Sequence, residues 1–564
     1  MNDSKLRCLL IADFTINTFA GYLANEAEAP ALSCQIAPFD QVTPVLLDAD
    51  HEVWRQQWQS AVVWTLPQKV SRTFQRRLQF EPSPAEEALA EVEQFCAQLQ
   101  QAAMRVPRLF VPTWTLPWQY RNFGPLDLTP EMGVTHLLWQ MNLRLADKLA
   151  ATPNIHLLAT HRWLQMAGKN GFNPALWYTA KVAFGNEVLQ EAARDLKAAL
   201  RGCAGQARKL LVLDLDDTLW GGVVGEQGWE NLRLGGHDFR GEAFVDFQRA
   251  LKALKQSGIL LALVSKNEES VALAAIRQHP EMVLREADFA AWRINWYDKA
   301  RNIADLVQEL NLGLQSVVFI DDHPVERERV RTALPEVLVP EWPEDPMRYV
   351  GALHSLTCFD RVTLTREDGL RNEMYAAERE RGALKQSLAS LDEWLASLAT
   401  RITVSPLTTA NLARASQLLN KTNQMNLSTR RLTETELQSW ARADGHWLRV
   451  VSISDKFGDA GLTGIVSWQR YGDGARLVDF VLSCRVMGRQ IEETMLALAL
   501  AEARAQDLTF LEASYLSTEK NKPCLTFFGR LGWERSEDVF RLPLTPHTIP
   551  FFPDHIILET SANA

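Results

Sequence analysis

Three apolar runs near the middle of the chain are each followed directly by polar residues. The runs are Leu210–Leu213, Ile259–Val264 and Val317–Ile320. Uninterrupted apolar runs of this length predict strands that are buried on both faces of a parallel sheet. Between the second and third runs, Lys299 begins a stretch whose apolar residues recur at helical spacing. The pattern therefore predicts a doubly wound α/β domain with a parallel sheet over about residues 205–360.

The polar residues after these runs are candidates for chemistry. Asp214 and Asp216 follow the first run, Ser265 the second, and Asp321 and Asp322 the third. Open α/β sheets bind ligands at the carboxyl ends of their strands. Carboxylates that meet there repel each other unless a proton or a cation lies between them. Mg²⁺ is the hard cation that prefers such oxygen ligands.

Taken in order, these motifs resemble those of the haloacid-dehalogenase (HAD) superfamily of phosphotransferases. The resemblance implies that Asp214 is the nucleophile that accepts a phosphoryl group. It implies that Asp216 protonates the leaving oxygen and then activates water. Ser265 would donate a hydrogen bond to the phosphoryl group, and Lys299 would neutralise its charge.

The same resemblance implies a Mg²⁺ cofactor. Its ligands would be Asp214, Asp322 and Asp216, the last through its backbone carbonyl. Asp321 would orient these ligands.

Two further segments narrow the resemblance to the FkbH-like proteins of polyketide assembly lines. They are Leu219–Gly236 and Phe319–Glu328. The chain departs from that pattern at Asp217 and His323, where family members usually have Asn. The short stretch between the first and second motifs leaves room for only a minimal cap domain. The site is expected to be open to bulky substrates or closed by another part of the chain.

The N-terminal block, about residues 1–200, predicts another α/β domain. Apolar strands are expected at Leu6–Ala12 and Ala61–Trp64, and Ser83–Glu86 has the composition of a helix start with Ser83 as N-cap. The block is similar to SGNH-type hydrolase folds. Where that family carries its Gly-Asp-Ser nucleophile, this chain has Ala12–Thr15, which lacks the serine. The expectation is a non-catalytic domain for binding or docking.

A charged helical connector is expected over residues 365–400, and an α+β domain over 400–550. In the latter, Arg485–Gln490 lies directly before a long helical stretch. It resembles the Arg/Gln-x-x-Gly-x-Gly/Ala loop of GNAT acetyltransferases, in which backbone amides such as that of Gly488 bind the pyrophosphate of coenzyme A. Gln490 stands at the third small-residue position, which disfavours coenzyme A itself.

Cys484 directly precedes Arg485 at the end of a predicted strand. A basic neighbour and a helix N-terminus would lower the pKa of the thiol and favour thiolate. The segment Ser483–Arg489 matches the FkbH-like family, which implies that Cys484 carries an acyl group as a thioester. Two alternatives stay open: Cys484 is a small buried apolar residue, or Cys524 carries the acyl group.

A dense run of amide side chains, Asn420–Asn426, precedes the strands of this last block. It suits hydrogen bonds to a hydroxylated ligand or to a pantetheine arm. It equally suits helix capping and turns.

The FkbH-like resemblance implies a bifunctional glyceryltransferase/phosphatase. Such an enzyme dephosphorylates 1,3-bisphosphoglycerate and loads a glyceryl unit onto the phosphopantetheine thiol of an acyl carrier protein. The order of the two steps, the pathway and the oligomeric state stay open. The alternatives are a stand-alone Mg²⁺ phosphatase whose GNAT-like domain only binds, an acetyl-CoA-dependent N-acetyltransferase, and a scaffold that docks carrier proteins.

Length and composition limit the number of domains, the partners and the cellular location that we expect. At 564 residues the chain is expected to form about two to four domains. Its net charge of −10 disfavours nucleic acid and anionic membranes as partners. The seven cysteines are scattered and odd in number, which favours reduced thiols over a disulfide framework or zinc site. Neither a signal peptide nor a membrane span is expected, and cytoplasmic location is the prediction.

Overall fold

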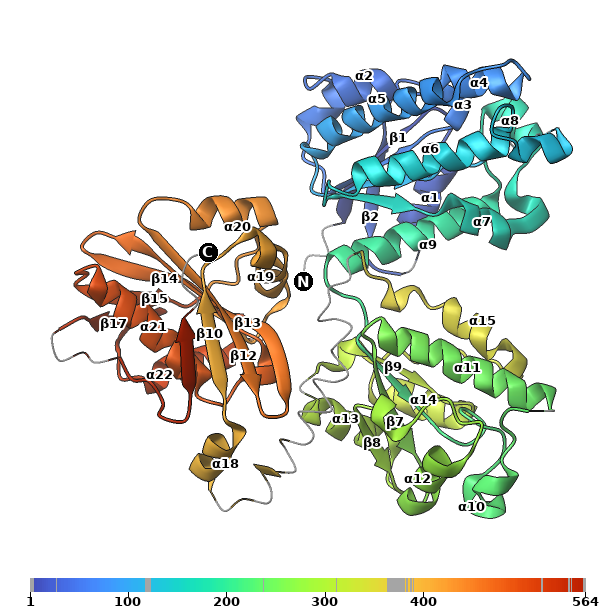
Figure 1. Ribbon diagram of the computed structural model, residues 1–564. Helices are drawn as coiled ribbons and strands as arrows, with labels where there is room; N and C mark the ends of the chain where they lie inside the picture. Colours follow the sequence, from blue (N-terminus) through green and yellow to red (C-terminus); the bar gives the residue numbers. More distant parts are fainter. Residues whose placement is uncertain are drawn as a thin grey trace. The chain divides into compact units, whose positions relative to one another are not determined.

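A computed structural model describes most of the chain (Figure 1). The described residues are 5–26, 28–116, 123–236, 238–310, 312–362, 381, 384–385, 388, 390–518, 521–545, 548 and 550–560. Their strands form a five-stranded, a four-stranded and a nine-stranded sheet. Contacts divide the chain into two compact units, one of residues 1–207 with 360–362 and the other of residues 208–359 with 363–564. The protein is therefore a multidomain α/β protein.

The first unit is built on a parallel sheet with strand order β2-β1-β3-β4-β5. Its strands are β1 (Leu6–Ala12), β2 (Leu32–Ile36), β3 (Ser60–Trp64), β4 (Leu109–Pro112) and β5 (Ile155–Leu158). Its helices are α1 (Asn17–Asn25), α2 (Val42–Leu47), α3 (Pro67–Val70), α4 (Arg72–Leu78), α5 (Ala85–Ala103), α6 (Val134–Leu149), α7 (Thr160–Ala167), α8 (Pro174–Ala180) and α9 (Asn186–Cys203).

Alternation along β1 gives this sheet two cores. Leu9 and Ile11 pack with α5 and α6 on one face, whereas Cys8 and Leu10 pack with α1 and α9 on the other (Figure 1). The predicted cap at Ser83 is wrong, because Pro84 is the N-cap residue of α5. The hydroxyl of Ser83 instead accepts from Arg77 Nε (3.4 Å).

The central sheet is also parallel, with strand order β8-β7-β6-β9. Its strands are β6 (Leu210–Leu213), β7 (Leu260–Ser265), β8 (Ala291–Ile294) and β9 (Val317–Ile320). Its helices are α10 (Val224–Gln227), α11 (Phe239–Gln256), α12 (Glu269–Gln278), α13 (Lys299–Glu309), α14 (Pro324–Ala333) and α15 (Tyr349–His354). The three predicted apolar strands and the helix that begins at Lys299 are confirmed.

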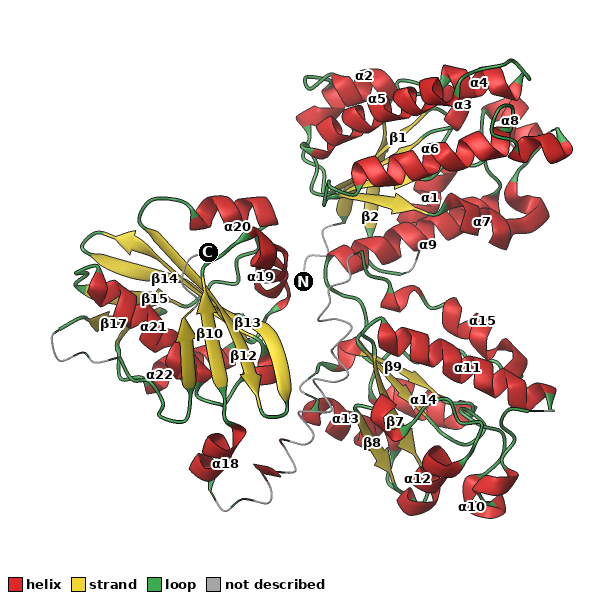
Figure 2. Cartoon of the chain, in the orientation of Figure 1, coloured by secondary structure: helices red, strands yellow, loops and turns green. Residues whose placement is uncertain are grey.

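The third sheet is mainly antiparallel (Figure 2). Its strands are β10 (Arg401–Ser405), β11 (Met425–Asn426), β12 (His446–Asp455), β13 (Gly458–Tyr471), β14 (Gly474–Leu482), β15 (Phe510–Ser514), β16 (Glu534–Ser536), β17 (Val539–Pro543) and β18 (Ile557–Thr560). The helices of this part are α18 (Leu391–Leu398), α19 (Thr409–Lys421), α20 (Glu434–Ala441), α21 (Ile491–Ala505) and α22 (Lys522–Arg530).

Most of the connector predicted over residues 365–400 lies outside the described residues, and α18 is its last described part. Within the described part of the chain, no helix is both long and apolar enough to cross a membrane. No disulfide joins any of the seven cysteines.

Candidate active site

The register of the central sheet brings distant carboxylates together. Leu213 at the end of β6 pairs with Ile320 at the end of β9, and the amide of Asp214 donates to the carbonyl of Ile320 (3.1 Å). The residues that follow these strands therefore meet at one edge of the sheet. Carboxylate oxygens of Asp214, Asp321 and Asp322 all lie within 4.8 Å of one another.

Lys299 forms ion pairs with two of these carboxylates. Its Nζ lies 2.9 Å from Asp214 Oδ2 and 2.6 Å from Asp321 Oδ2, and its side chain is 4% exposed. Burial alone would lower the pKa of the ammonium, but the two carboxylate charges outweigh that effect and raise it. Lys299 is therefore a fixed positive charge at the site. It occupies the first position of α13, which Asp298 caps by accepting from Arg301 N (3.1 Å).

The carboxylates outnumber this ammonium three to one. Burial and the charge of Asp214 raise the pKa of Asp321 and of Asp322 to about 6. Asp214 Oδ1 is buried and accepts no hydrogen bond from the described residues. Hard oxygen ligands, excess negative charge and a buried oxygen without a donor together fit a divalent cation such as Mg²⁺.

Asp216 has a different environment from Asp214. Its Oδ1 accepts from Trp220 Nε1 (2.9 Å) and from the amide of Val224 (3.1 Å). Its Oδ2 accepts from Asn267 Nδ2 (2.9 Å). Burial raises the pKa of Asp216, and these three hydrogen bonds oppose that rise. A carboxyl group with a raised pKa suits a proton donor.

The side-chain cluster adds Asp321 to the predicted ligands Asp214 and Asp322. The Asp216 carboxylate lies outside this cluster and accepts hydrogen bonds from Trp220 and Asn267. Asp216 could contribute only its backbone carbonyl, as the resemblance implied. Asp321, expected to orient the ligands, itself lies among them.

Sequence reasoning missed Asn267, which links two predicted site residues. Its Nδ2 donates to Asp216 Oδ2 (2.9 Å) and to the hydroxyl of Ser265 (3.2 Å), the last residue of β7. Asn267 is buried. The signal available in the sequence was an amide two residues beyond a strand that ends at the ligand-binding edge.

Thr218 positions the third carboxylate. Its hydroxyl donates to Asp322 Oδ1 (3.3 Å) and accepts from the amide of Asp322 (3.2 Å). Thr218 is fully buried. These two hydrogen bonds act locally, so Thr218 holds Asp322 in place rather than reacting.

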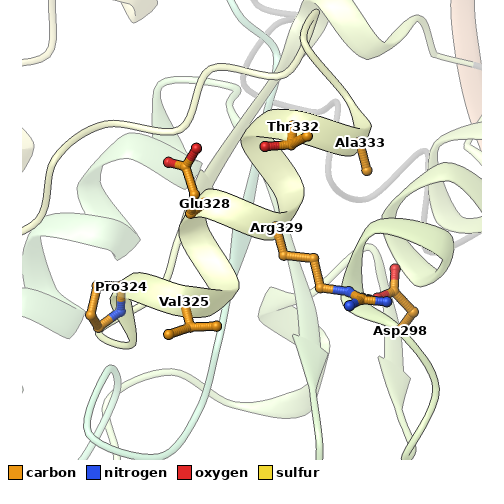
Figure 3. A pocket seen from close by; sticks show the side chains of 7 residues that line it. All are labelled: Asp298, Pro324, Val325, Glu328, Arg329, Thr332 and Ala333. Carbon is orange, nitrogen blue, oxygen red and sulfur yellow. Dashed lines mark hydrogen bonds and ion pairs between the residues drawn. The ribbon is translucent and has the colours of Figure 1, made fainter.

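A hollow of about 640 Å³ lies beside the starts of α13 and α14 (Figure 3). Asp298 and one side of α14 line it, and Arg329 of α14 is ion-paired with Asp298. Three large apolar side chains near these helix starts are exposed, namely Trp296 and Tyr297 before α13 and Val325 in the first turn of α14. This edge of the domain is thus open and partly apolar.

In the third sheet, Cys484 does not have the surroundings that its sequence neighbours predict. It begins a three-residue 3₁₀ turn, and α21 begins only at Ile491. Burial raises the pKa of Cys484 despite the nearby charge of Arg485, which opposes the lowered pKa that its sequence neighbours predict. Burial also raises the pKa of Cys524, to about 12. Cys484 is partly exposed, whereas Cys524 is fully buried.

The loop that resembles a pyrophosphate-binding loop already has a carboxyl group as its hydrogen-bond partner. The amide of Gly488 donates to Glu492 Oε1 (3.0 Å), and burial raises the pKa of that carboxyl. Arg485 Nε donates to the hydroxyl of Ser483 (3.2 Å). A carboxylate at this amide would repel a pyrophosphate group.

The strands β14 and β15 separate before the end of β14, which leads into this loop. β14 pairs with β15 only over Ala475–Leu477, while β13 pairs along its other edge. Further along β14, the edge that β15 leaves unpaired is taken by β11. Met425 pairs with Leu482, and Asn426 pairs with Val481. The gap between the two strands is therefore filled by the chain itself.

The amide run that contains β11 serves this packing. Asn426 Nδ2 donates to Thr422 O (3.0 Å), and its Oδ1 accepts from Thr429 N (2.9 Å). Asn521 Nδ2 donates to the carbonyl of Asn426 (3.0 Å) from the start of α22. Of the two interpretations of this run, the structure favours capping and turns.

Comparisons with solved structures found several that are similar to this chain, and one of them covers nearly two thirds of it. It is the N-terminal part of the protein BF1531 from Bacteroides fragilis, which contains a phosphatase domain and is complexed with Mg. That structure is 26% identical, with a TM-score of 0.58 over 64% of this chain and 95% of its own.

Two further similar structures each cover about a quarter of the chain. The ribosomal-protein-S18-alanine N-acetyltransferase from Escherichia coli is 13% identical over 27% of this chain and 99% of its own, with a TM-score of 0.21. YncA from Salmonella typhimurium, a putative acetyltransferase with acetyl-CoA, is 14% identical over 27% of this chain and 98% of its own, also at 0.21. No protein-family model and no curated protein matches the chain. The described fold is thus similar to that of a protein part that contains a phosphatase domain.

Proposed function

We propose that the central domain is a HAD-type phosphatase. The carboxylate of Asp214 attacks the phosphorus of a phosphomonoester, and the bond from phosphorus to the leaving oxygen breaks. Asp216 gives its proton to that oxygen, and the product is an aspartyl-phosphate. Asp216 then takes a proton from water, which attacks phosphorus and releases phosphate. The observation that carries this proposal is that Asp214 and Asp216 have different partners. Asp214 is ion-paired with Lys299, whereas Asp216 accepts hydrogen bonds from Trp220, Val224 and Asn267.

Lys299 and the neighbouring polar groups would bind the phosphoryl group. Lys299 lies 2.9 Å from Asp214 Oδ2 and keeps its charge, so it offsets the negative charge that gathers in the transition state. Ser265 would donate its hydroxyl proton to a phosphoryl oxygen. Asp214, Asp321 and Asp322 would hold Mg²⁺, which supplies further charge neutralisation when bound.

For the whole chain we propose the bifunctional FkbH-like activity. 1,3-Bisphosphoglycerate carries an acyl phosphate, which a thiolate can attack without ATP, and a phosphate ester, which needs a phosphatase. Cys484 would attack the acyl carbonyl, release phosphate and form a thioester. The phosphopantetheine thiol of an acyl carrier protein would then displace Cys484, for polyketide biosynthesis. The partial exposure of Cys484 supports this role over Cys524.

A second candidate is a Mg²⁺ phosphatase whose GNAT-like third domain only binds. Three observations favour it: the raised pKa of Cys484, the Glu492 carboxylate on the loop amide, and the strand β11 in the gap. The last two observations also weigh against acetyl-CoA-dependent acetylation. Acyl transfer would need a base that deprotonates Cys484.

We propose no catalysis for the SGNH-like first domain. Phe14 stands where that family has its serine, and its ring packs edge-on against Trp64 (5.5 Å between centroids). Phe14 is buried in the core of the sheet. A binding or docking role remains the proposal for this domain.

Intact-protein mass spectrometry separates the candidates. The protein is mixed with Mg²⁺, 1,3-bisphosphoglycerate generated in place and a holo acyl carrier protein. A glyceryl-sized gain on the carrier that is lost in Asp214→Asn and in Cys484→Ala, but kept in Cys524→Ala, supports the bifunctional enzyme. Phosphate release without any gain on the carrier overturns the transferase and leaves the phosphatase. Failure to release phosphate overturns both.

A further inference from the structure

Two cysteines lie directly opposite each other in the first unit. Cys8 of β1 and Cys34 of β2 are register partners in a parallel pair. Partners in a sheet point to the same face, and adjacent strands lie about 4.7–4.9 Å apart. That spacing falls within the range of about 4.4–6.8 Å between the Cα atoms of a disulfide. Both side chains contact the core under α1 and α9.

The two thiols differ in exposure and in how their strands are paired. Cys8 is fully buried, whereas Cys34 is half-buried. β2 is the edge strand of the sheet and pairs with β1 alone among the described strands. Cys34 can therefore meet a small solute, and its strand can shift toward Cys8 without breaking a second ladder.

A buried lysine lies close to this pair. Lys197 of α9 is fully buried, and its Nζ donates to the carbonyls of Glu26 (2.7 Å) and Glu28 (2.8 Å). Because both acceptors are uncharged, the ammonium can still stabilise an anion. A hydrogen bond from Cys8 and the charge of Lys197 lower the pKa of Cys34, against the effect of burial.

The other cysteines of this unit lack such an arrangement. Burial raises the pKa of Cys96 to about 11 and also raises that of Cys203. On the far side of Cys8, Ser60 of β3 is its other register partner. A hydrogen bond with Cys34 and burial raise the pKa of the Cys8 thiol, and a hydrogen bond with Ser60 opposes that rise.

We propose that Cys34 is a modification site for hydroperoxides and that Cys8 resolves the product. The Cys34 thiolate attacks the outer peroxide oxygen, the O–O bond breaks, and the protonated product is an alcohol or water beside Cys34 sulfenic acid. The Cys8 sulfur then attacks the Cys34 sulfur, and hydroxide leaves with the Cys8 proton as water. Two thiols are oxidised to one disulfide, and one hydroperoxide is reduced.

This site is independent of the phosphatase and transferase proposals. It uses neither Asp214 nor Cys484. Disulfides that form in a reducing compartment are usually transient and redox-sensing, which is compatible with the cysteine usage of the chain.

The test is a peroxide titration of the full-length protein, followed by alkylation and mass spectrometry. Trypsin leaves both cysteines in one peptide, since residues 8–55 contain Arg55 as the sole basic cleavage site. A protease that cuts after Glu separates them at Glu26 and Glu28. We expect a disulfide-linked pair of peptides whose mass is two hydrogens below the sum of the two reduced peptides. Dithiothreitol should return both peptides to the reduced form.

Variants assign the roles within the pair. Cys8→Ser should leave a sulfenic acid at Cys34 that dimedone labels, and Cys34→Ser should abolish the link. Lys197→Met should slow the reaction severalfold, whereas Cys96→Ser should leave its rate unchanged. In the wild type, Cys34 should react many times faster than Cys96. Equal reactivity of Cys34 and Cys96, or oxidation of Cys34 without a link to Cys8, overturns the proposal.

Discussion

Asp214 and Asp216 stand two residues apart but have different partners. Asp214 is ion-paired with Lys299 and keeps one oxygen without a donor, whereas both oxygens of Asp216 accept hydrogen bonds. Environments that separate the protonation of two carboxylates also separate their roles. The pair can thus supply a nucleophile and an acid at the same pH.

Replacing Asp216 should affect the chemistry and spare the metal. We expect Asp216→Asn to lower phosphate release by about 10²–10⁴-fold, which is typical for loss of a general acid–base group. Mg²⁺ affinity should stay unchanged, because the Asp216 side chain lies outside the carboxylate cluster. Asp322→Asn should instead weaken Mg²⁺. Titration calorimetry and phosphate assays measure both effects, and a loss of Mg²⁺ in Asp216→Asn would contradict the assignment.

Asn267 should tune the acid that it contacts. Its hydrogen bond lowers the pKa of Asp216, so Asn267→Ala should raise that pKa further. The first step needs protonated Asp216, so its rate falls as pH rises through the pKa of Asp216. This descending limb of the pH–rate profile should therefore move to higher pH in Asn267→Ala. Single-turnover release of the leaving group against pH measures this shift. Thr218→Ala, which alters Asp322 instead, is the control and should leave the limb in place.

Asp13 should make the first unit less stable at neutral pH. Burial raises its folded pKa to about 7, even though the amide of Leu66 donates to both oxygens. The ordinary pKa is about 3.9, so the folded state binds more protons between pH 4 and 7, and stability falls as pH rises through that window. A shift of this size is worth on the order of 4 kcal/mol.

Asp13→Asn should remove that dependence, because its amide oxygen can still accept from Leu66. Calorimetric melting at pH 5 and pH 8 measures the effect. The variant should gain most at pH 8. An equal gain at both pH values would show that the carboxyl does not titrate as assigned.

At the scale of elements, uninterrupted apolar runs predicted the strands that matter most. β6, β7 and β9 are buried along their whole length, and their sequences show it. β8 was missed, because its central residues Trp292 and Arg293 are only partly buried on an edge strand and break the apolar run. The start of α5 was misplaced because Ser83 found a tertiary partner in Arg77.

β11 is an element that local sequence could not predict. It is two residues long, and partners far away in the chain hold it. Asn521 is central, since its Oδ1 accepts from Tyr515 Oη (2.7 Å) and Thr518 N (2.8 Å) while Nδ2 donates to the carbonyl of Asn426. Without the Asn521 side chain, the buried groups that it contacts would lose their hydrogen-bond partner, which should lower the stability of the folded state.

Asn521→Ala should therefore free β11 from the gap. We expect a loss of about 2 kcal/mol or more in stability of the third domain. Hydrogen exchange at the amides of Met425 and Asn426 should become faster. Asn411→Ala, which removes the side chain that accepts from Thr408 N, is the matched control. It should leave exchange in β11 unchanged. Unaltered exchange in Asn521→Ala would mean that Asn521 does not hold the strand.

At the scale of the whole molecule, the sequence predicted the central site better than the third domain. The central residues follow strands whose neighbours are set by a parallel sheet, so Asp214 and Asp321 had to meet at one edge. The surroundings of Cys484 depend on burial by segments distant in sequence, which raised a pKa that local charges predicted to fall. Motif spacing carries the first kind of information and not the second.

The separate sheets imply that Mg²⁺ should stabilise one part of the chain selectively. Each sheet has apolar cores of its own, and the three carboxylates lie at one edge of the central sheet. A ligand that binds only the folded form stabilises by about 2.7 kcal/mol at 100 times its Kd. Calorimetry should therefore show that Mg²⁺ moves the unfolding transition of the unit with the central sheet to higher temperature, while that of the first unit stays in place.

The pH dependence of this shift follows from the same carboxyls. Asp321 and Asp322 have pKa values of about 6, so both are largely protonated at pH 5 and ionised at pH 8. Metal binding needs the ionised forms, and the Mg²⁺-induced shift should be larger at pH 8. Asp322→Asn or excess EDTA should remove it. If all transitions moved together, Mg²⁺ would be acting on the molecule as a whole, and the carboxylate cluster would not be its site.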